Sequence, residues 1–340
     1  MPQSDVEDIT YVLDPVTAAA YARARGLDVA EGSARLLSGG VSSTVVALDG
    51  EPPIVLKQAL PRLRVAAAWD ADPARSSTEA RALALLRGIT PRHVPRILDA
   101  DPASHILALE RAPLDWGDWR TALLAGPREE DVDRGRLAGG ILGRWHAATW
   151  GDAALRSAFD APHAFEQLRL DPFHRELLRR DAAPAAPLEL LVRQLAGERQ
   201  CLVHGDYSPK NVLVGDGGMW VIDAEVAHFG AAVFDLAFLT AHLALKALHL
   251  REAAALLERV ALAFLAGYAE ANAGRVDPGD VARHAAAIML ARVDGKSPAG
   301  YLSDDEASRA RRTALAVLGA PDPSTAALWQ PAVADSGGVS

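Results

Sequence analysis

Short apolar runs separated by turn residues dominate the first 110 positions of the chain. Two of these runs, 44–48 and 54–57, are rich in Val, Ile and Leu, and Asp49-Gly50 between them is a hairpin signal. A helix is expected at 77–86, because the Ser and Thr residues and the glutamate at its start are typical of helix N-termini. The pattern therefore predicts a largely antiparallel sheet with one inserted helix. The other elements predicted in this part are a short helix at 15–26 and strands at 36–37, 94–98 and 106–109.

After Glu110 the apolar residues recur at helical spacing. The stretch from 115 to 200 is expected to form several helices, because Gly- and Pro-containing breaks divide it. A hairpin at 201–223, with apolar runs at 201–203 and 212–214, interrupts the helices. The helices predicted beyond it are 234–250, 252–272, 278–292 and 304–318.

The change from short strand-like apolar runs to helical spacing of apolar residues predicts an α+β fold with two lobes. We expect an N-terminal lobe over 1–112, built from an antiparallel β-sheet and one main helix. A larger, mostly helical C-terminal lobe is expected over 113–320, followed by a loose tail over 321–340. A chain of 340 residues is long enough to bury a core in each lobe.

Composition and charge narrow the class of protein. The formal net charge is −9 and no block of Lys and Arg occurs, which argues against a nucleic-acid partner. The single cysteine, Cys201, excludes an internal disulfide and a cysteine-based zinc cluster. Residues 1–14 lack the apolar segment of a signal peptide, and the apolar runs are far too short to span a bilayer. A cytoplasmic protein without a membrane partner is expected, and its oligomeric state is left open.

The most informative stretch runs from His204 to Asn211, His-Gly-Asp-Tyr-Ser-Pro-Lys-Asn, between two apolar runs. Asp206 precedes Asn211 by five positions, and Asp223 follows Asn211 by twelve, behind the apolar pair Val-Ile. This is the spacing of a kinase catalytic loop and its metal site. One carboxylate has to orient and deprotonate an attacking hydroxyl, while an amide oxygen and a second carboxylate hold Mg²⁺.

Asp206 is therefore the candidate catalytic base, and Asn211 and Asp223 are the candidate ligands of Mg²⁺. The alternative is an ordinary turn between two buried strands, in which His, Asp and Asn serve turn geometry alone. An isolated His-Gly-Asp would favour that alternative, whereas Asn211 and Asp223 at the matching positions favour the kinase site.

Three further groups of residues are candidates for binding ATP. Gly39, Gly40 and Ser42 lie in a turn of small residues whose backbone N–H groups can approach phosphates, although any hairpin needs such a turn. Lys57 ends an apolar strand, where a lysine can reach the α- and β-phosphates if a carboxylate such as Glu79 holds it. The alternative is a solvated strand-end charge, with Glu79 complementing the helix dipole.

Positions around the junction of the predicted lobes complete the candidate set. Glu110 and Ala112 lie where backbone groups would hold the adenine ring. Asp235, at the start of a predicted helix, is expected to be a buried carboxylate that ties the catalytic loop down, and His204 to brace that loop. Arg292 belongs to a charged loop at 291–298 that either reaches an acceptor or is a solvated helix end.

The stretch from His204 to Asn211, followed by Val-Ile-Asp223, resembles the catalytic core of the aminoglycoside phosphotransferase and choline kinase group of small-molecule kinases. The segment from Asp223 to Gly230 is similar in particular to 5-methylthioribose kinase, which has an Asp-x-Glu at a comparable place. The resemblance implies a protein-kinase-like fold and an enzyme that uses ATP and Mg²⁺ to phosphorylate a hydroxyl of a small metabolite or antibiotic. It also implies a role for Glu225 in the geometry of the metal or its loop.

Two other classes of protein share parts of this pattern. A non-catalytic kinase-like protein would bind nucleotide or metabolite without transferring phosphate, but such proteins usually lose one of the residues at positions 57, 206, 211 and 223, which are intact here. A protein kinase would need an activation loop bracketed by Asp-Phe-Gly and Ala-Pro-Glu. Gly230 lies seven positions after Asp223 and a helix is predicted soon afterwards, which leaves little room for a peptide platform.

Overall fold

The chain divides into two compact units. The computed structural model describes residues 11–37, 40–64, 69–160, 162–272 and 274–330. The first unit is Met1–Leu114 with Ile222–Val226, and the second is Asp115–Val221 with Ala227–Ser340. The segment Ile222–Val226, which the pattern assigns to the helical lobe, therefore belongs to the unit that contains the sheet.

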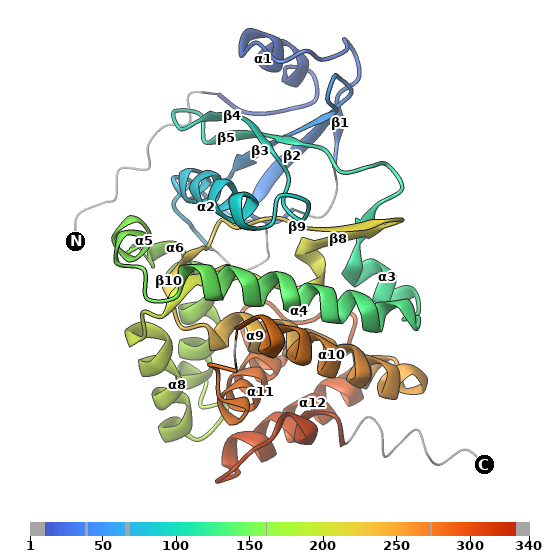
Figure 1. Cartoon of the computed structure of the whole chain (residues 1–340). Coiled ribbons are helices and arrows are strands. Elements are labelled where there is room, and N and C mark those ends of the chain that lie inside the picture. The colour runs from blue at the N-terminus through green and yellow to red at the C-terminus, as the bar shows by residue number, and fades with distance from the viewer. Residues whose placement is uncertain (1–10, 38–39, 65–68, 161, 273, 331–340) are drawn as a thin grey trace. The chain divides into compact units, whose positions relative to one another are not determined.

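The first unit is built on a five-stranded antiparallel sheet with the order β1-β2-β3-β5-β4 (Figure 1). β2 and β3 form the predicted hairpin, with Leu48 opposite Ile54. β4 starts at Ile97, later than predicted, because Pro95 lacks the backbone N–H that a strand needs. The strands are β1 Arg35–Leu36, β2 Ser43–Leu48, β3 Ile54–Ala59, β4 Ile97–Asp101 and β5 Ile106–Glu110.

Two helices cover opposite faces of this sheet. Side chains alternate between the faces along a strand, so neighbouring residues of β3 meet different partners. Leu56 is fully buried in the apolar core that the sheet forms with α1 (Ala18–Ala24). Lys57, the next residue, makes an ion pair with Glu79 of α2 (Arg75–Ile89) at 2.7 Å. The sheet thus has an apolar face toward α1 and a charged position toward α2.

The second unit is mainly helical, as the spacing of its apolar residues predicts. Its long helices agree with the predicted ones to within a few residues at their ends. The helices and helical turns are α3 Trp119–Ala125, α4 Glu130–Thr149, α5 Ala153–Ala158, α6 His163–Phe165, the π-helix η1 Glu166–Arg175, α7 Glu176–Arg179, α8 Ala185–Gly197, η2 Pro209–Asn211, α9 Val233–His249, η3 Arg251–Ala253, α10 Ala254–Asn272, α11 Pro278–Asp294, α12 Asp304–Gly319 and η4 Thr325–Leu328.

The predicted hairpin at 201–223 is wrong in its pairing. β7 (Cys201–Val203) pairs with β10 (His228–Gly230), with Val203 opposite His228. β8 (Val212–Gly215) lies in another sheet, between β6 (Gly117–Asp118) and β9 (Gly218–Val221). The residues between β7 and β8 send the chain from one sheet to the other, because Gly205 adopts a φ of 77° and a 3₁₀ turn follows.

The predicted loose tail is wrong for residues 321–330. This stretch contains η4, which contacts α11 and α12. Leu328 and Trp329 are fully buried, so apolar side chains anchor this stretch to the second unit.

Among the described residues, none of the helices combines the length and the apolar character that a bilayer crossing requires.

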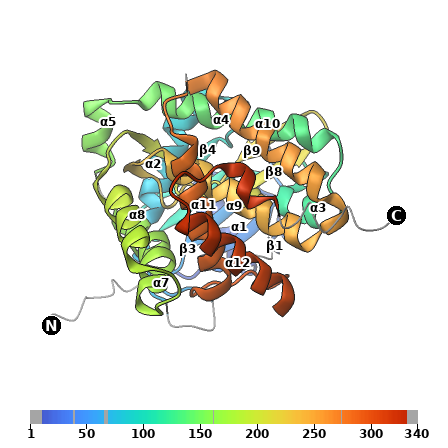
Figure 2. The ribbon, with the colours of Figure 1, turned by 90° about the horizontal axis from the view of Figure 1, so that it is seen from below.

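Glycines at four-residue spacing let α4 and α10 approach closely. Figures 1 and 2 show the two helices side by side. A Cβ at Gly139 would lie 1.9 Å from the carbonyl oxygen of Phe264, and one at Gly135 would lie 2.5 Å from that of Val260. Gly140, one position further, has no such neighbour, because its Cβ would meet the end of Arg144 at 3.6 Å. The contact between the helices thus depends on one face of α4.

We expect Gly139→Ala to lower the free energy of unfolding by about 1–3 kcal/mol, because a methyl group there forces two backbones apart. Gly140→Ala is the matched control, and it should raise the free energy of unfolding by up to about 1 kcal/mol through helix propensity. Urea unfolding of the two variants and the parent measures both effects. Equal effects of the two substitutions would contradict the close approach of α4 and α10.

Candidate functional site

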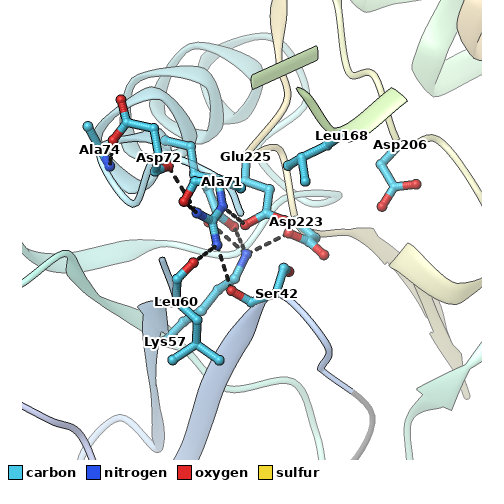
Figure 3. A network of polar contacts seen from close by, with 12 residues as sticks. Ser42, Lys57, Leu60, Ala71, Asp72, Ala74, Leu168, Asp206, Asp223 and Glu225 are labelled. Atoms are coloured by element: carbon cyan, nitrogen blue, oxygen red, sulfur yellow. Dashed lines mark hydrogen bonds and ion pairs between the residues drawn. The ribbon is translucent and has the colours of Figure 1, made fainter. Parts of the chain in front are cut away.

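Lys57 is the centre of a buried ionic network in the first unit. Its Nζ donates to both carboxylate oxygens of Glu79 at 2.7 Å and to Oδ1 of Asp223 at 2.6 Å (Figure 3). Burial by itself would lower the pKa of Lys57, but the charges of Asp223 and Glu79 outweigh it and raise the pKa. Lys57 is therefore an ammonium ion at neutral pH. It lies on β3 and is held by Glu79 of the inserted helix, as the sequence predicts.

Glu79 reaches Lys57 from the second turn of α2. Its side chain is 2% exposed, and burial raises its pKa to about 7 against the opposing charge of Lys57. The predicted pairing of Lys57 with Glu79 is therefore present, while the alternative of a solvated strand-end charge is excluded by burial.

Arg75 is a second buried cation, and no motif in the sequence marks it. Its Nε donates to Oε2 of Glu225 at 3.0 Å, and its Nη2 donates to the carbonyl oxygens of Ser42 and Leu60. The same guanidinium reaches the carbonyls of residues 71 and 72 through Nη1 (Figure 3). Arg75 thereby links the small-residue turn to the segment Ile222–Val226. A sequence signal existed, because Arg75 lies four positions before Glu79 and hence on the same helix face.

Asp223 has a backbone conformation that is uncommon for a residue with a side chain. Its φ is 68°, in the left-handed region that Asp and Asn tolerate better than most residues. One oxygen each from Glu79, Asp223 and Glu225 lie within 4.8 Å of one another. Carboxylate oxygens are the ligands that Mg²⁺ prefers, so the chemistry of this donor set fits such an ion. Asp223 is the most exposed of the three, at 16%, whereas Glu79 and Glu225 are 2% and 5% exposed.

The small-residue turn is described in part. Gly39 lies outside the described residues. A Cβ at Gly40 would lie 2.9 Å from the carbonyl oxygen of Ser43, so a side chain there would crowd the backbone. The carbonyl oxygen of Ser42 accepts hydrogen bonds from Arg75 and from the backbone N–H of Leu60. The base of the turn is therefore fixed to the start of α2.

The two adenine-binding candidates lie at the end of β5 and just beyond it. The backbone N–H of Glu110 donates to the carbonyl of Arg96 at 2.8 Å, and its carboxylate forms an ion pair with the same residue. Among the residues described, the backbone of Ala112 makes no hydrogen bond, whereas that of Arg111 donates to Pro53. Ala112 is thus the better candidate of the two for holding a ligand through its backbone.

Asp206 and Asn211 are brought together in the second unit. The Nδ2 of Asn211 donates to Oδ2 of Asp206 at 2.7 Å and to its carbonyl at 3.0 Å. In the described part of the unit the Oδ1 of Asn211 accepts no hydrogen bond, which leaves this amide oxygen for another ligand. Arg169 of the π-helix η1 forms an ion pair with Oδ2 of Asp206 at 2.6 Å. Sequence reasoning missed Arg169, because it lies 37 positions before Asp206 in a stretch without a motif.

Asp235 holds the backbone of the same loop. It is fully buried, and its carboxylate accepts hydrogen bonds from the N–H groups of His204 and Gly205 at 2.7 and 2.8 Å. Burial alone would raise the pKa of Asp235, but hydrogen bonds and charge from His146 and His204 lower it. The Nδ1 of His204 accepts from the N–H of Asp206 at 3.2 Å, so the brace expected at His204 is present. Asp235 is too buried to meet a substrate and acts on the loop instead.

Arg292 lies in the last turn of α11. Its Nη1 donates to the carbonyl oxygen and, at 2.7 Å, to the hydroxyl of Ser297. Burial lowers the pKa of Arg292, which a solvated helix end would not experience. The interpretation of this loop as a solvated helix end is therefore wrong for Arg292.

Comparison with known proteins gives a family match. Residues 33–278 match the model of the phosphotransferase enzyme family. Methylthioribose kinase of Cronobacter sakazakii is 27% identical to this chain over 213 residues, which are 54% of this chain and 52% of that protein. Methylthioribose kinase of Erwinia tasmaniensis is 28% identical over 215 residues, with 54% and 52% covered. The chain thus spans about half the length of the curated relatives it matches.

Solved structures are similar to this chain over most of its length. A macrolide 2′-phosphotransferase of Brachybacterium faecium has a TM-score of 0.52 and 22% identity, and covers 90% of this chain and 98% of its own. A choline/ethanolamine kinase family protein of Mesorhizobium loti has a TM-score of 0.51 and 15% identity, and covers 89% and 93%. At these identities the likeness concerns the fold. It confirms the predicted α+β, protein-kinase-like fold class.

We expect Arg75→Met to lower the free energy of unfolding by about 3–5 kcal/mol, because the substitution leaves Glu225 buried without its partner. Arg62→Met is the matched control, since Arg62 forms an exposed ion pair with Asp70 in the same unit. Loss of that pair should cost no more than about 1 kcal/mol. Urea unfolding compares the two. A cost for Arg75→Met as small as the control's would show that the pair with Glu225 is not buried in solution.

Proposed function

Because this chain belongs to the phosphotransferase enzyme family, we propose that it transfers the γ-phosphate of ATP to a hydroxyl of a small molecule. The single observation that carries the proposal is the binding of the Lys57 ammonium to Glu79 and Asp223 together. Catalysts of phosphoryl transfer need a fixed cation for the phosphates and a carboxylate for the metal ion, and these three residues supply both.

The proposed binding of ATP rests on residues of the first unit. Lys57 donates its N–H groups to the α- and β-phosphates while Glu79 keeps it oriented. The backbone of Gly40 and Ser42 approaches the triphosphate, and Ala112 takes the adenine through its backbone groups. Each of these assignments uses a group whose chemistry matches one part of the nucleotide.

Mg²⁺ is the proposed metal ion, and Asp223 and Asn211 are its proposed ligands. Mg²⁺ neutralises charge on the phosphates when bound. The carboxylate of Asp223 is the most exposed of its cluster, and the amide oxygen of Asn211 accepts no hydrogen bond within the described residues. Glu225 is held by Arg75, so its proposed role is to fix the backbone that carries Asp223.

Asp206 is the proposed catalytic base. The acceptor oxygen forms a bond to the γ-phosphorus, the bond from that phosphorus to the β-γ bridging oxygen of ATP breaks, and ADP leaves. The hydroxyl proton passes to the carboxylate of Asp206 and then to solvent. Asn211 and Arg169 orient this carboxylate, and the amides of the loop are oriented by Asp235. Catalysis consists mostly of positioning and charge stabilisation, because a loose phosphoryl transition state needs little covalent help.

The relatives suggest where to search for the acceptor. Methylthioribose is the first compound to test, because the name of the curated relatives is methylthioribose kinase. Macrolides and choline or ethanolamine follow from the names of proteins with a similar fold. The second candidate function is a non-catalytic protein that binds nucleotide or metabolite, and the intact pair of Asp206 and Asn211 counts against it.

We expect Asp206→Asn to lower kcat by about 10²–10⁴-fold, because general-base catalysis contributes that much to rates. Affinity for Mg·ATP should stay within about two-fold of the parent, since the proton acceptor contributes to the chemical step and not to nucleotide binding. ADP release across an acceptor panel and calorimetric titration of nucleotide measure the two quantities. Asp216→Asn, in the exposed turn between β8 and β9, is the control and should leave both unchanged. Near-normal kcat in Asp206→Asn would exclude Asp206 as the base.

Asp223→Asn should weaken the affinity for Mg·ATP by about ten-fold or more, because a charged ligand of the ion is lost. Asn is the appropriate replacement, since it tolerates the left-handed backbone at this position. The difference between parent and variant should vanish when EDTA removes Mg²⁺. An unchanged affinity in the presence of Mg²⁺ would rule out a metal role for Asp223.

A further inference from the structure

Four cationic side chains from four helices of the second unit stand out in the region of Asp206. We call them the cationic cluster: Arg120 of α3, Arg169 of η1, Lys246 of α9 and Arg292 of α11. Burial and the charges of Arg120 and Arg292 lower the pKa of Lys246 to about 7. Burial also lowers the pKa of Arg292, and the charges of Arg169 and Arg120 add to this effect. Geometry places three of them around α9: Arg169 lies 5.5 Å from the ring centre of Phe238, Lys246 donates to the carbonyl of His242, and α11, which carries Arg292, packs against the same helix.

Two members of the cationic cluster have a carboxylate partner. Arg169 forms an ion pair with Asp206 at 2.6 Å, and the Nε of Arg120 lies 3.6 Å from Asp118. Lys246 and Arg292 form no ion pair with any carboxylate among the described residues. When Lys246 is protonated, the cluster contains two cations more than its own acidic residues neutralise.

Lys246 is the most costly of these charges. Its side chain is fully buried at 0% exposure. Its Nζ donates one long hydrogen bond, 3.3 Å, to the carbonyl of His242 and lies 5.5 Å from the ring centre of Tyr301. A buried ammonium without an anion destabilises a fold, and lysine is rarely found fully buried without a partner. Its full burial without an anionic partner therefore points to a ligand and not to stability.

Hydrogen-bond donors next to the cationic cluster are also unsatisfied. The Nε of Arg292 and the hydroxyl of Tyr301 are buried and have no hydrogen-bond partner in the part of the chain that the structure describes. The segment before Tyr301 contacts Arg292 directly, because the N–H of Ala299 donates to the carbonyl of Arg292 at 2.7 Å and the hydroxyl of Ser297 accepts from its guanidinium. Buried polar atoms are almost always bonded, and these two lack an acceptor. An anion with several oxygen atoms would satisfy them together with Lys246.

The other titratable groups around Lys246 do not supply that anion. Burial and the surrounding cations lower the pKa of His242 well below its usual value, so this side chain is neutral. The carboxylate of Glu306 is bonded to His249 at 3.1 Å. Asp118 and Asp206 are the carboxylates already paired with Arg120 and Arg169.

On the basis of the proposed function, we propose that the acceptor of this kinase is a hydroxylated acid whose carboxylate or phosphate group binds Lys246 and Arg292. The hydroxyl to be phosphorylated then faces Asp206, which Arg169 links to the same cluster. Phosphoryl transfer proceeds as described above, and the anionic group of the acceptor takes no part in bond making. The net charge of −9 would favour cationic acceptors, but the field inside a site is set by the charges that line it.

Acceptors that share a carbon skeleton and differ in charge test this proposal. Glycerol, glycerate and glycerol 3-phosphate form one series, and glucose, gluconate and glucose 6-phosphate form another. We expect at least one acid to exceed its neutral analogue by about ten-fold or more in kcat/KM, because charge-assisted hydrogen bonds are about twice as strong as neutral ones. Whether the carboxylate or the phosphate member is preferred identifies the anionic group.

Lys246→Met should remove this preference through a higher KM for the acid, with little change for the neutral compound. The variant should unfold at the same temperature as the parent or at a higher one, because a buried unpaired charge is lost. Arg259→Met is the matched control. Arg259 lies on α10 and forms an exposed ion pair with Glu129, so the substitution also removes one positive charge. Arg292→Gln provides an independent second variant with the same expected loss. Equal preference for the acid in Lys246→Met, Arg292→Gln and the parent would overturn the proposal.

A binding measurement separates this inference from the proposed function. Malonate and inorganic phosphate, which cannot accept a phosphoryl group at a carbon-bound hydroxyl, serve as probes in thermal-shift titrations with saturating ADP present. Stabilisation of the parent but not of Lys246→Met supports the anion site even if no acceptor turns over, in which case the kinase proposal fails by itself. Turnover of neutral acceptors, with no effect of either anion on the parent, supports the kinase and overturns the anion site.

Discussion

Charge burial is the constraint on which the first unit depends. Lys57 and Arg75 are 11% and 1% exposed, and a cation removed from water needs carboxylates close by. Those carboxylates come from α2 and from the segment Ile222–Val226, which is distant in sequence. Because each cation has a partner in that segment, the segment is fixed next to β3 and α2.

A buried charge also organises the loop from His204 to Asn211 in the second unit. Here the buried charge is a carboxylate, and backbone N–H groups stabilise it. Asp235 is fully buried, and two backbone N–H groups and an imidazole surround its carboxylate. A carboxylate that accepts several hydrogen bonds stays ionised in such surroundings. The loop from His204 to Asn211 thus has a fixed backbone before any ligand binds, and the side chains of Asp206 and Asn211 start from defined positions. Preorganisation of this kind is what phosphoryl transfer requires.

Local patterns in the sequence predicted the elements and the residues that motifs contain. The pairing of Lys57 with Glu79 followed from a strand end and a helix start, and the brace at Asp235 from the residue's place before an apolar helix. Strand pairing could not be predicted, because the sequence of a three-residue strand such as β7 does not show whether it pairs with β10 or with β8. Arg75 and Arg169 were missed for a related reason, because their partners lie 150 and 37 positions away and arginine is common in this chain. Asp206, Asn211 and Asp223 remain predictions as far as their roles are concerned.

The connectivity of the two units limits how the protein can be divided. The chain passes from one unit to the other after Leu114, after Val221 and after Val226. A fragment that ends at Leu114 would contain the whole sheet but would lack Asp223 and Glu225. Lys57 would then keep Glu79 alone, and Arg75 would lose Glu225, its carboxylate partner. Domain truncation, split-protein reporters and limited proteolysis at the first junction should therefore yield a destabilised N-terminal piece, even though that piece includes every strand of its sheet.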